Sequence, residues 1–253
     1  MKKIFSFFCI LSFLAISSSA FATRVAVYAP SGHTSFFEII TYTTYESGQY
    51  LTFSYAVLTY QSTDPSYGGY NNPGPSGDVI IPSTVTYNGN TYTVKGIGSH
   101  AFDGCNELTS VSIPNTVISI GDYAFRGCSA LLSINIPNTV TSIGACAFSG
   151  CTNLPSVVIP NSVTTIAQSL FSGCTSLSSV TIPSSITSIG YCAFQNCYNL
   201  TSVTIPNSVS TIGSWAFSHC GMISVTVHAN ITYVDYNAFE NIPTVYYYGV
   251  ALD

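Results

Sequence analysis

The feature that most constrains this chain is a sequence unit that recurs every 23 residues. One proline marks each copy, and a phenylalanine and a cysteine keep the same step. The prolines are Pro114, Pro137, Pro160, Pro183 and Pro206. The phenylalanines run from Phe102 to Phe217, and the cysteines from Cys105 to Cys220. Self-similarity at this period is typical of an array in which each unit packs only against its neighbours.

Each unit predicts one strand, because polar and apolar residues alternate in its first part. The unit reads L-x-S-V-x-I-P-N-x-V-x-x-I-G-x-x-A-F-x-G-C-x-x. Complete copies begin at Leu108, Leu131, Leu154, Leu177 and Leu200. In the stretch 200–205, Val203 and Ile205 face one way, while Ser202 and Thr204 face the other. Pro206 cannot donate to a ladder, so the strand is expected to end before it.

The second half of each unit is expected to return across the core. We interpret Gly213 as a tight bend. Ala216, Phe217 and Cys220 are apolar and are spaced for one short helical or 3₁₀ turn, since no segment reaches the roughly ten residues of an ordinary helix. Stacked coils would bury a core that one coil cannot bury alone, with parallel strands ~4.8 Å apart.

The unit resembles the BspA-like class of bacterial leucine-rich repeats, whose pattern is I-P-x-x-V-x-x-I-G-x-x-A-F-x-x-C. The resemblance covers roughly residues 79–239. It implies a β-rich leucine-rich-repeat solenoid of the α/β horseshoe class, with one parallel strand per coil and short helical or 3₁₀ turns on the convex side. It also implies a secreted or cell-surface protein, because some members of the class adhere to host proteins or to other cells.

The chain divides into four predicted regions. They are a signal peptide (1–22), an N-terminal β-rich cap (23–78), the repeats (79–243) with a hairpin insert near 85–94, and a C-terminal capping strand (244–253). The cap region lacks the repeat and holds eight of the 18 tyrosines, so an aromatic binding surface for carbohydrate or protein is the alternative interpretation.

The N-terminus predicts export. Lys2 and Lys3 precede an apolar run over 4–16, and Ala20-Phe21-Ala22 fits a cleavage site. The run is shorter than the roughly 20 residues of a spanning helix, and no later run is longer, so no membrane span is expected in the mature chain. Only five Lys and Arg occur, which argues against nucleic acid as a partner.

The cysteines are expected to stay reduced and buried. Eight remain after cleavage, and six share one register that points into the core. Cys146 and Cys192 share another register two coils apart, about 9.6 Å, which exceeds the reach of a disulfide. No C-x₂-C pair supports zinc, and we expect neither a metal nor a cofactor. Cys151→Ser is expected to cost about 1–3 kcal/mol as a poorly satisfied buried hydroxyl.

No catalytic motif occurs, so the sequence predicts a non-enzyme. Neither H-E-x-x-H nor G-x-S-x-G is present. A polysaccharide lyase solenoid is disfavoured because one strand per unit and three basic residues after cleavage do not suit it. The predicted function is adhesion to a protein or a cell-surface glycan. A passive spacer and, less favoured, a carbohydrate-active enzyme are the alternatives.

Two surfaces compete for the binding role. The predicted concave face presents small polar residues such as Ser179 and Thr204, which offer little apolar area. Variation concentrates just before the Ala-Phe pair, where Tyr123, Tyr191 and Trp215 occur. Because exposed Trp and Tyr anchor interfaces, these three residues are the predicted binding site. Packing between coils is the alternative role for them.

Overall fold

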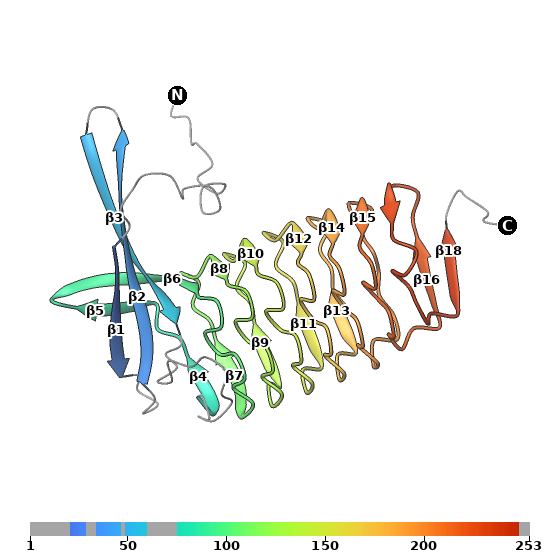
Figure 1. Ribbon diagram of the computed structural model, residues 1–253, viewed down its shortest axis with the longest axis horizontal. Helices are drawn as coiled ribbons and strands as arrows, with labels where there is room; N and C mark the ends of the chain where they lie inside the picture. Colours follow the sequence, from blue (N-terminus) through green and yellow to red (C-terminus); the bar gives the residue numbers. More distant parts are fainter. Residues whose placement is uncertain (1–20, 29–33, 47–48, 60–74, 248–253) are drawn as a thin grey trace.

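The computed structural model describes residues 21–28, 34–46, 49–59 and 75–247, and it describes side chains in 75–247. Within that last range the chain is a β-solenoid whose coils stack along one axis (Figure 1). Nearly all of the predicted signal peptide, residues 1–20, lies outside the described residues, as do 60–74 and 248–253. The strand β1 (Phe21–Tyr28) includes the last two residues of the predicted leader.

Most coils carry two short strands, so the prediction of one strand per coil is wrong. The first strand falls at the L-x-S-V segment, and the second at the residue pair that ends in the isoleucine of I-G. The first strands are β4 (Gly77–Ile80), β7 (Leu108–Ser112), β9 (Ser133–Asn135), β11 (Ser156–Val158), β13 (Ser179–Thr181), β16 (Ser224–Val227) and β18 (Thr244–Tyr247). The second strands are β6 (Asn90–Ile97), β8 (Ser119–Ile120), β10 (Ser142–Ile143), β12 (Thr165–Ile166), β14 (Ser188–Ile189), β15 (Thr211–Ile212) and β17 (Tyr233–Val234). Two-residue strands are too short to leave an alternation signal.

The strands pair in parallel between coils, with two breaks among the first strands and one break among the second strands. The first strands form the sheets β4-β7-β9, β11-β13 and β16-β18. The second strands form β6-β8-β10 and β12-β14-β15-β17. The stretch 200–205, predicted as a strand, joins neither neighbouring sheet. Its side chains still follow the predicted alternation, since Val203 packs against the core and Ile205 is buried.

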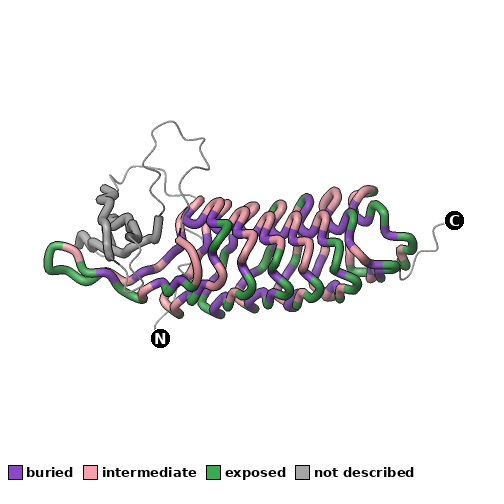
Figure 2. Tube along the Cα trace, turned by 90° about the horizontal axis from the view of Figure 1, so that it is seen from below, coloured by how far each residue is buried: buried purple, intermediate pink, exposed green. Residues whose placement is uncertain are grey.

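The core repeats in register, because the same positions are buried in every coil (Figure 2). The Phe residues from Phe102 to Phe239 stack along the axis with ring centroids 5.0–5.6 Å apart and planes within 16°. Burying a Phe side chain contributes roughly 1.5–3 kcal/mol, so this column is a principal source of cohesion between coils.

Turns, and no helix, fill the segment that carries the Ala-Phe pair. Within the described residues the predicted helical or 3₁₀ turns are absent. The N–H groups there alternate between two directions. Asp103 donates to His100 O in its own coil at 3.2 Å, whereas Phe102 donates to Ala124 O in the next coil at 2.7 Å. A helix would turn all of these donors back on its own carbonyls, which would remove the bonds between coils.

The glycine of the I-G pair is needed for close packing of coils, which corrects its interpretation as a bend. A Cβ added at Gly121 would lie 2.5 Å from Ser99 N, and one at Gly213 would lie 2.9 Å from Tyr191 N. Neither glycine has a positive φ. Left-handed backbone occurs instead before the six cysteines that share the 23-residue step. That residue is glycine in four coils, with φ 75° at Gly104 and 71° at Gly127, and it is Asn196 or His219 in the other two.

The N-terminal strands extend the sheet that the second strands β6, β8 and β10 form. The strand β1 pairs antiparallel with β2 (Thr34–Glu46), and β2 pairs with β3 (Gln49–Thr59). The strand β3 then pairs in parallel with β6. The hairpin of β5 (Thr84–Tyr87) and β6 turns at Asn88-Gly89, whose φ values of 49° and 76° suit a tight hairpin. Among the described residues, no helix has the length and apolarity needed to cross a bilayer.

Candidate binding edge

The outward positions of the Ala-Phe turns form a continuous edge along the solenoid, which we call the turn edge. It consists of the two residues before each Ala-Phe pair and the residue after it. The position immediately before the pair is filled by a different side chain in most coils, whereas its backbone conformation is constant. The φ angles there are 53–60° at His100, Tyr123, Cys146, Ser169, Cys192 and Trp215. The left-handed region disfavours β-branched residues, and none of these six is β-branched.

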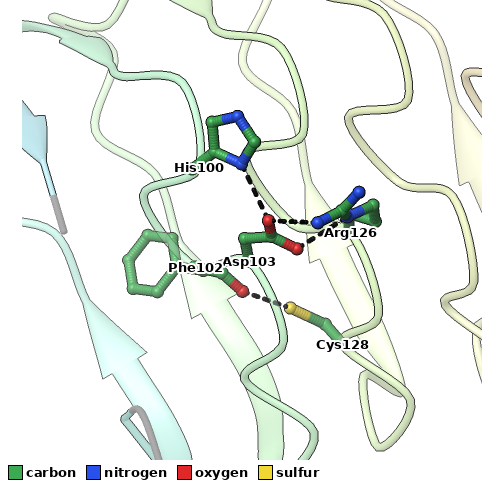
Figure 3. Close-up of polar contacts among 5 residues, drawn as sticks. All are labelled: His100, Phe102, Asp103, Arg126 and Cys128. Carbon is green, nitrogen blue, oxygen red and sulfur yellow. Dashed lines mark hydrogen bonds and ion pairs between the residues drawn. The ribbon is translucent and has the colours of Figure 1, made fainter. Parts of the chain in front are cut away.

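At the first coils, the side chains of His100, Asp103, Tyr123 and Arg126 on the turn edge form a cluster that we call the charged clasp. Figure 3 shows three of them, His100, Asp103 and Arg126. Arg126 donates from Nε and Nη2 to the two carboxylate oxygens of Asp103, at 2.8 and 2.7 Å. His100 Nδ1 lies 2.7 Å from Asp103 Oδ2. The His100 ring stacks on the Tyr123 ring at 4.8 Å and 12°, and the Arg126 guanidinium lies over the same ring at 4.8 Å.

The carboxylate and the guanidinium of the clasp pair with one another. Asp103 is only 16% exposed, and its two oxygens accept a bidentate guanidinium, which is the strongest geometry for such a pair. Arg126 is 41% exposed and borders a shallow hollow over the backbone of Gly104, Gly127 and Gly150. The sequence predicted Tyr123 at the binding site, but the structure places one of its faces against His100 and Arg126.

At the later coils, the turn edge carries three aromatic side chains that we call the aromatic patch: Tyr191, Trp215 and Tyr236. The Tyr191 and Trp215 rings meet edge to face, with centroids 5.4 Å apart and planes at 79°. Tyr191 is 43% exposed, Tyr236 is 92% exposed, and Trp215 is partly buried. Trp215 therefore remains in the predicted site, which full burial would have excluded.

The structure brings Tyr191 and Trp215 together but leaves Tyr123 apart. Tyr123 and Trp215 occupy one register four coils apart, which corresponds to about 19 Å. The coils between them place Cys146, Ser169 and Cys192 in that register. The predicted site residues omitted Tyr236, although the sequence holds the signal for it, since Tyr236 repeats the position of Tyr191 two coils later.

Charge is absent from most of this surface. No Asp, Glu, Lys or Arg occurs between Arg126 and Asp235. Asp235 itself accepts hydrogen bonds from Asn237 N at 3.1 Å and from Tyr233 Oη at 3.2 Å. A hydrogen bond from Ser214 holds the pKa of Asp235 below its usual range, and the Asn237 N–H bond adds to that effect. The coils of the aromatic patch thus carry two carboxylates, Asp235 and Glu240, and each accepts a hydrogen bond, that of Glu240 from Ser218 Oγ at 3.4 Å.

A column of thiols lies beneath the edge, inside the core. From Cys128 to Cys220, each thiol of the column donates to the carbonyl of a Phe one coil back, as in Cys151 Sγ to Phe125 O at 3.2 Å and Cys174 Sγ to Phe148 O at 3.1 Å. Burial raises the pKa of Cys174 to about 12 and that of Cys220 to about 12. These thiols are therefore protonated donors at neutral pH and are unsuited to nucleophilic or metal-binding roles.

A Ser, a His and a Glu approach one another near the C-terminal end, but their arrangement does not suit hydrolysis. Ser218 Oγ lies 2.7 Å from His219 Nδ1 and 3.4 Å from Glu240 Oε2. The carboxylate therefore contacts the serine and not the histidine, so it cannot orient the ring as a triad requires. Ser218 is also fully buried, which denies a substrate access to its hydroxyl. Across the described residues, no group of three metal-ligating side chains occurs.

The family model described as the BspA type leucine rich repeat region matches six copies, at residues 79–135, 95–176 and 123–246. The chain belongs to the BspA-type leucine-rich repeat family. Members share a repeat-protein scaffold, and leucine-rich repeat proteins generally bind other proteins. Comparison with curated proteins gives no match.

Solved structures support the same assignment. A leucine-rich repeat protein of T. pallidum is 30% identical over 76% of this chain and 78% of its own, with a TM-score of 0.55. A leucine-rich repeat protein from Eubacterium ventriosum is 28% identical over 76% of this chain, with a TM-score of 0.58, and the match spans 48% of its length.

Proposed function

We propose that this BspA-type protein is exported and mediates adhesion, binding a macromolecular partner at the turn edge. The aromatic patch is the observation that carries the proposal. Its side chains are exposed on a backbone whose donors are bonded on both sides, as in Cys192 N to Ser214 O at 2.9 Å and Ser218 N to Trp215 O at 3.2 Å. A rigid exposed Trp or Tyr can contribute about 2 kcal/mol or more when it anchors an interface.

The rival surface is the outer face of the first strands, which we call the strand face. Its side chains are less suited to anchoring a partner. Its outward residues are small and polar, and Asp78 at its first strand already accepts from Thr109 at 2.9 Å and from Ser110 at 2.6 Å. Water satisfies exposed hydroxyls almost as well as a partner does, so each such contact gains only about 0.5–1.5 kcal/mol. A passive spacer without any partner is the second alternative, and it would not need exposed aromatic residues.

Binding of the exported protein to whole cells and to a panel of extracellular proteins and glycans tests the proposal. Trp215→Ala and Tyr191→Ala are expected to weaken binding at least tenfold while leaving the unfolding transition cooperative. Tyr198→Ala is the matched control, because Tyr198 is exposed but lies outside the turn edge. If Ser179→Arg and Thr204→Arg abolish binding and the aromatic variants do not, the strand face is the binding surface.

Export is tested separately, by the N-terminal sequence of protein recovered from the medium or cell surface. Cleavage after Ala22 would leave Thr23 as the first residue. Recovery of the intact N-terminus in the cytoplasm alone would overturn this part of the proposal.

A further inference from the structure

We propose that the aromatic patch is a binding site for an uncharged glycan chain. This inference rests on the proposed function, since it names the chemical class of the partner that the turn edge takes. It commits to sugar in place of a protein because of three properties of the patch: the spacing of its rings, the polar groups that flank it, and the absence of basic side chains.

The ring spacing matches an extended chain of pyranose units. Tyr191 and Tyr236 occupy one register on coils two steps apart, which corresponds to about 9.6 Å. Trp215 stands on the coil between them and contacts Tyr191 edge to face. One coil rise is close to the length of one pyranose ring, so three successive coils present an aromatic side chain at each of three successive sugar positions.

The chemistry of the flanks suits hydroxyl groups. Gln168 precedes Tyr191 by one coil, and Asn237 follows Trp215 by one coil in its register. Gln168 is exposed and Asn237 is partly exposed, and neither side-chain amide makes a hydrogen bond with another described residue. Each amide can both donate to and accept from a hydroxyl. The negative face of an aromatic ring, in turn, attracts the weakly positive C–H face of a pyranose.

The patch has no basic side chain, which disfavours an acidic ligand. The segment from 127 to 234 contains no Asp, Glu, Lys or Arg, and the coil of Tyr236 adds only the carboxylates of Asp235 and Glu240, so an acidic partner would lose hydration there without gaining an ion pair. Glu240 Oε2 accepts from Ser218 Oγ at 3.4 Å. Asp235 is held by Asn237 N and by Tyr233 Oη, which leaves it poorly placed to bind a cation. Typical protein interfaces use Arg beside Trp and Tyr, and the coils of the patch contain no Arg.

The single tryptophan of the chain makes the patch directly observable. Because Trp215 is the only Trp, intrinsic fluorescence excited at the indole reports on this site and no other. The full chain is titrated with neutral hexasaccharides, namely β-1,4-linked glucose, β-1,4-linked xylose and α-1,4-linked glucose, and with oligogalacturonate as the acidic counterpart. At least one neutral chain is expected to change the Trp215 emission saturably, and the acidic chain is expected to leave it unchanged.

Variants locate the response. Tyr191→Ala and Tyr236→Ala are each expected to raise the Kd for the neutral chain at least fivefold, whereas Tyr198→Ala, at an exposed tyrosine elsewhere, leaves it unchanged. Trp215→Phe, measured by calorimetry, should bind more weakly than the wild type. The inference is overturned if no neutral chain alters Trp215 emission up to millimolar concentration, or if Tyr198→Ala weakens binding as much as the patch variants do.

The same panel separates failure of this inference from failure of the proposed function. If the protein captures an extracellular protein through Tyr191 and Trp215 while neutral glycans produce no response, the turn edge is a binding surface and the glycan assignment is wrong. If the protein binds neither cells, proteins nor glycans, both proposals fall and the spacer alternative stands.

Discussion

The charged clasp and the aromatic patch occupy the same turn edge of the same repeat, yet their side chains behave in opposite ways. In the clasp, Asp103 accepts from Arg126 and lies against His100, and Tyr123 is covered by both neighbours. In the patch, Tyr191 and Trp215 contact only by a ring edge, and Tyr236 is almost wholly exposed. The repeat fixes where a side chain emerges, and the residues of the adjacent coils decide whether it serves stability or remains available to a partner.

One continuous core joins the charged clasp to the aromatic patch, and a substitution in that core is expected to have the largest effect on stability. Phe171 lies between the two regions and stacks on Phe148 and Phe194 at 5.6 and 5.5 Å. Phe171→Ala is expected to lower the free energy of unfolding by about 3–5 kcal/mol, because it removes a fully buried ring and leaves a cavity. Urea unfolding measures the loss. In a nearest-neighbour array the weakened interface should also separate the ends into two transitions. A cost below about 1 kcal/mol would contradict the stack as a source of cohesion.

The clasp is expected to be a stability element only. Asp103→Asn removes the carboxylate charge that contacts Arg126 and His100, and we expect a loss of about 1.5–2 kcal/mol in the free energy of unfolding, at the low end of the range for hydrogen bonds to charged groups. Trp215 emission and glycan binding should not change, because the patch is about 19 Å away and distant sites act independently. The double variant Asp103→Asn with Tyr191→Ala should show the two effects in sum, and strong coupling between them would erase the distinction between the regions.

The thiol column should be equally tolerant of serine beneath both regions. The sequence predicted that Cys151→Ser would bury an unsatisfied hydroxyl, but Phe125 O is available as its acceptor. We therefore expect a loss of about 1 kcal/mol, below the range for an unpaired group. Cys128→Ser and Cys197→Ser, whose thiols donate at 3.2 Å to Phe102 O and Phe171 O, should cost similar amounts by urea unfolding. Cys151→Ala is the control that leaves the carbonyl without its donor.

The smallest expected effect is on thermal stability at low pH. It involves Asp78, near the first coil, and Asp235, near the last. Hydrogen bonds from Ser110 and Thr109 lower the pKa of Asp78, and a hydrogen bond from Ser214 lowers that of Asp235, from an ordinary value of 3.8. A depressed folded-state pKa means that each carboxylate stabilises the fold above pH 3.8, and that this contribution is lost as the pH falls through the folded value. The Tm differences between wild type and Asp78→Asn or Asp235→Asn should therefore shrink below about pH 4. Differences that grow in acid would contradict this account.

Sequence alone predicted the coil and its core well, because Leu, Val, Ile, Phe and Cys recur at fixed offsets and only a stacked array buries them all. It did not predict the second strand, since the pair Ser119-Ile120 is too short to show a period. The turn around Phe125 was predicted as helical because apolar spacing cannot reveal that alternate N–H groups bond to the next coil. In the site, Tyr191 and Trp215 were predicted together, but a shared register did not reveal that Tyr123 belongs to a different cluster.

Because the bonds between neighbouring coils join residues 22 to 26 apart in the sequence, as Thr187 to Thr164 and Cys174 to Phe148 do, whole units can be added or removed without disturbing the register. Each unit gained or lost in tandem would move the clasp and the patch by ~4.8 Å relative to one another and change neither. Duplication or loss of units therefore changes the length of the solenoid, while the patch at one end stays intact.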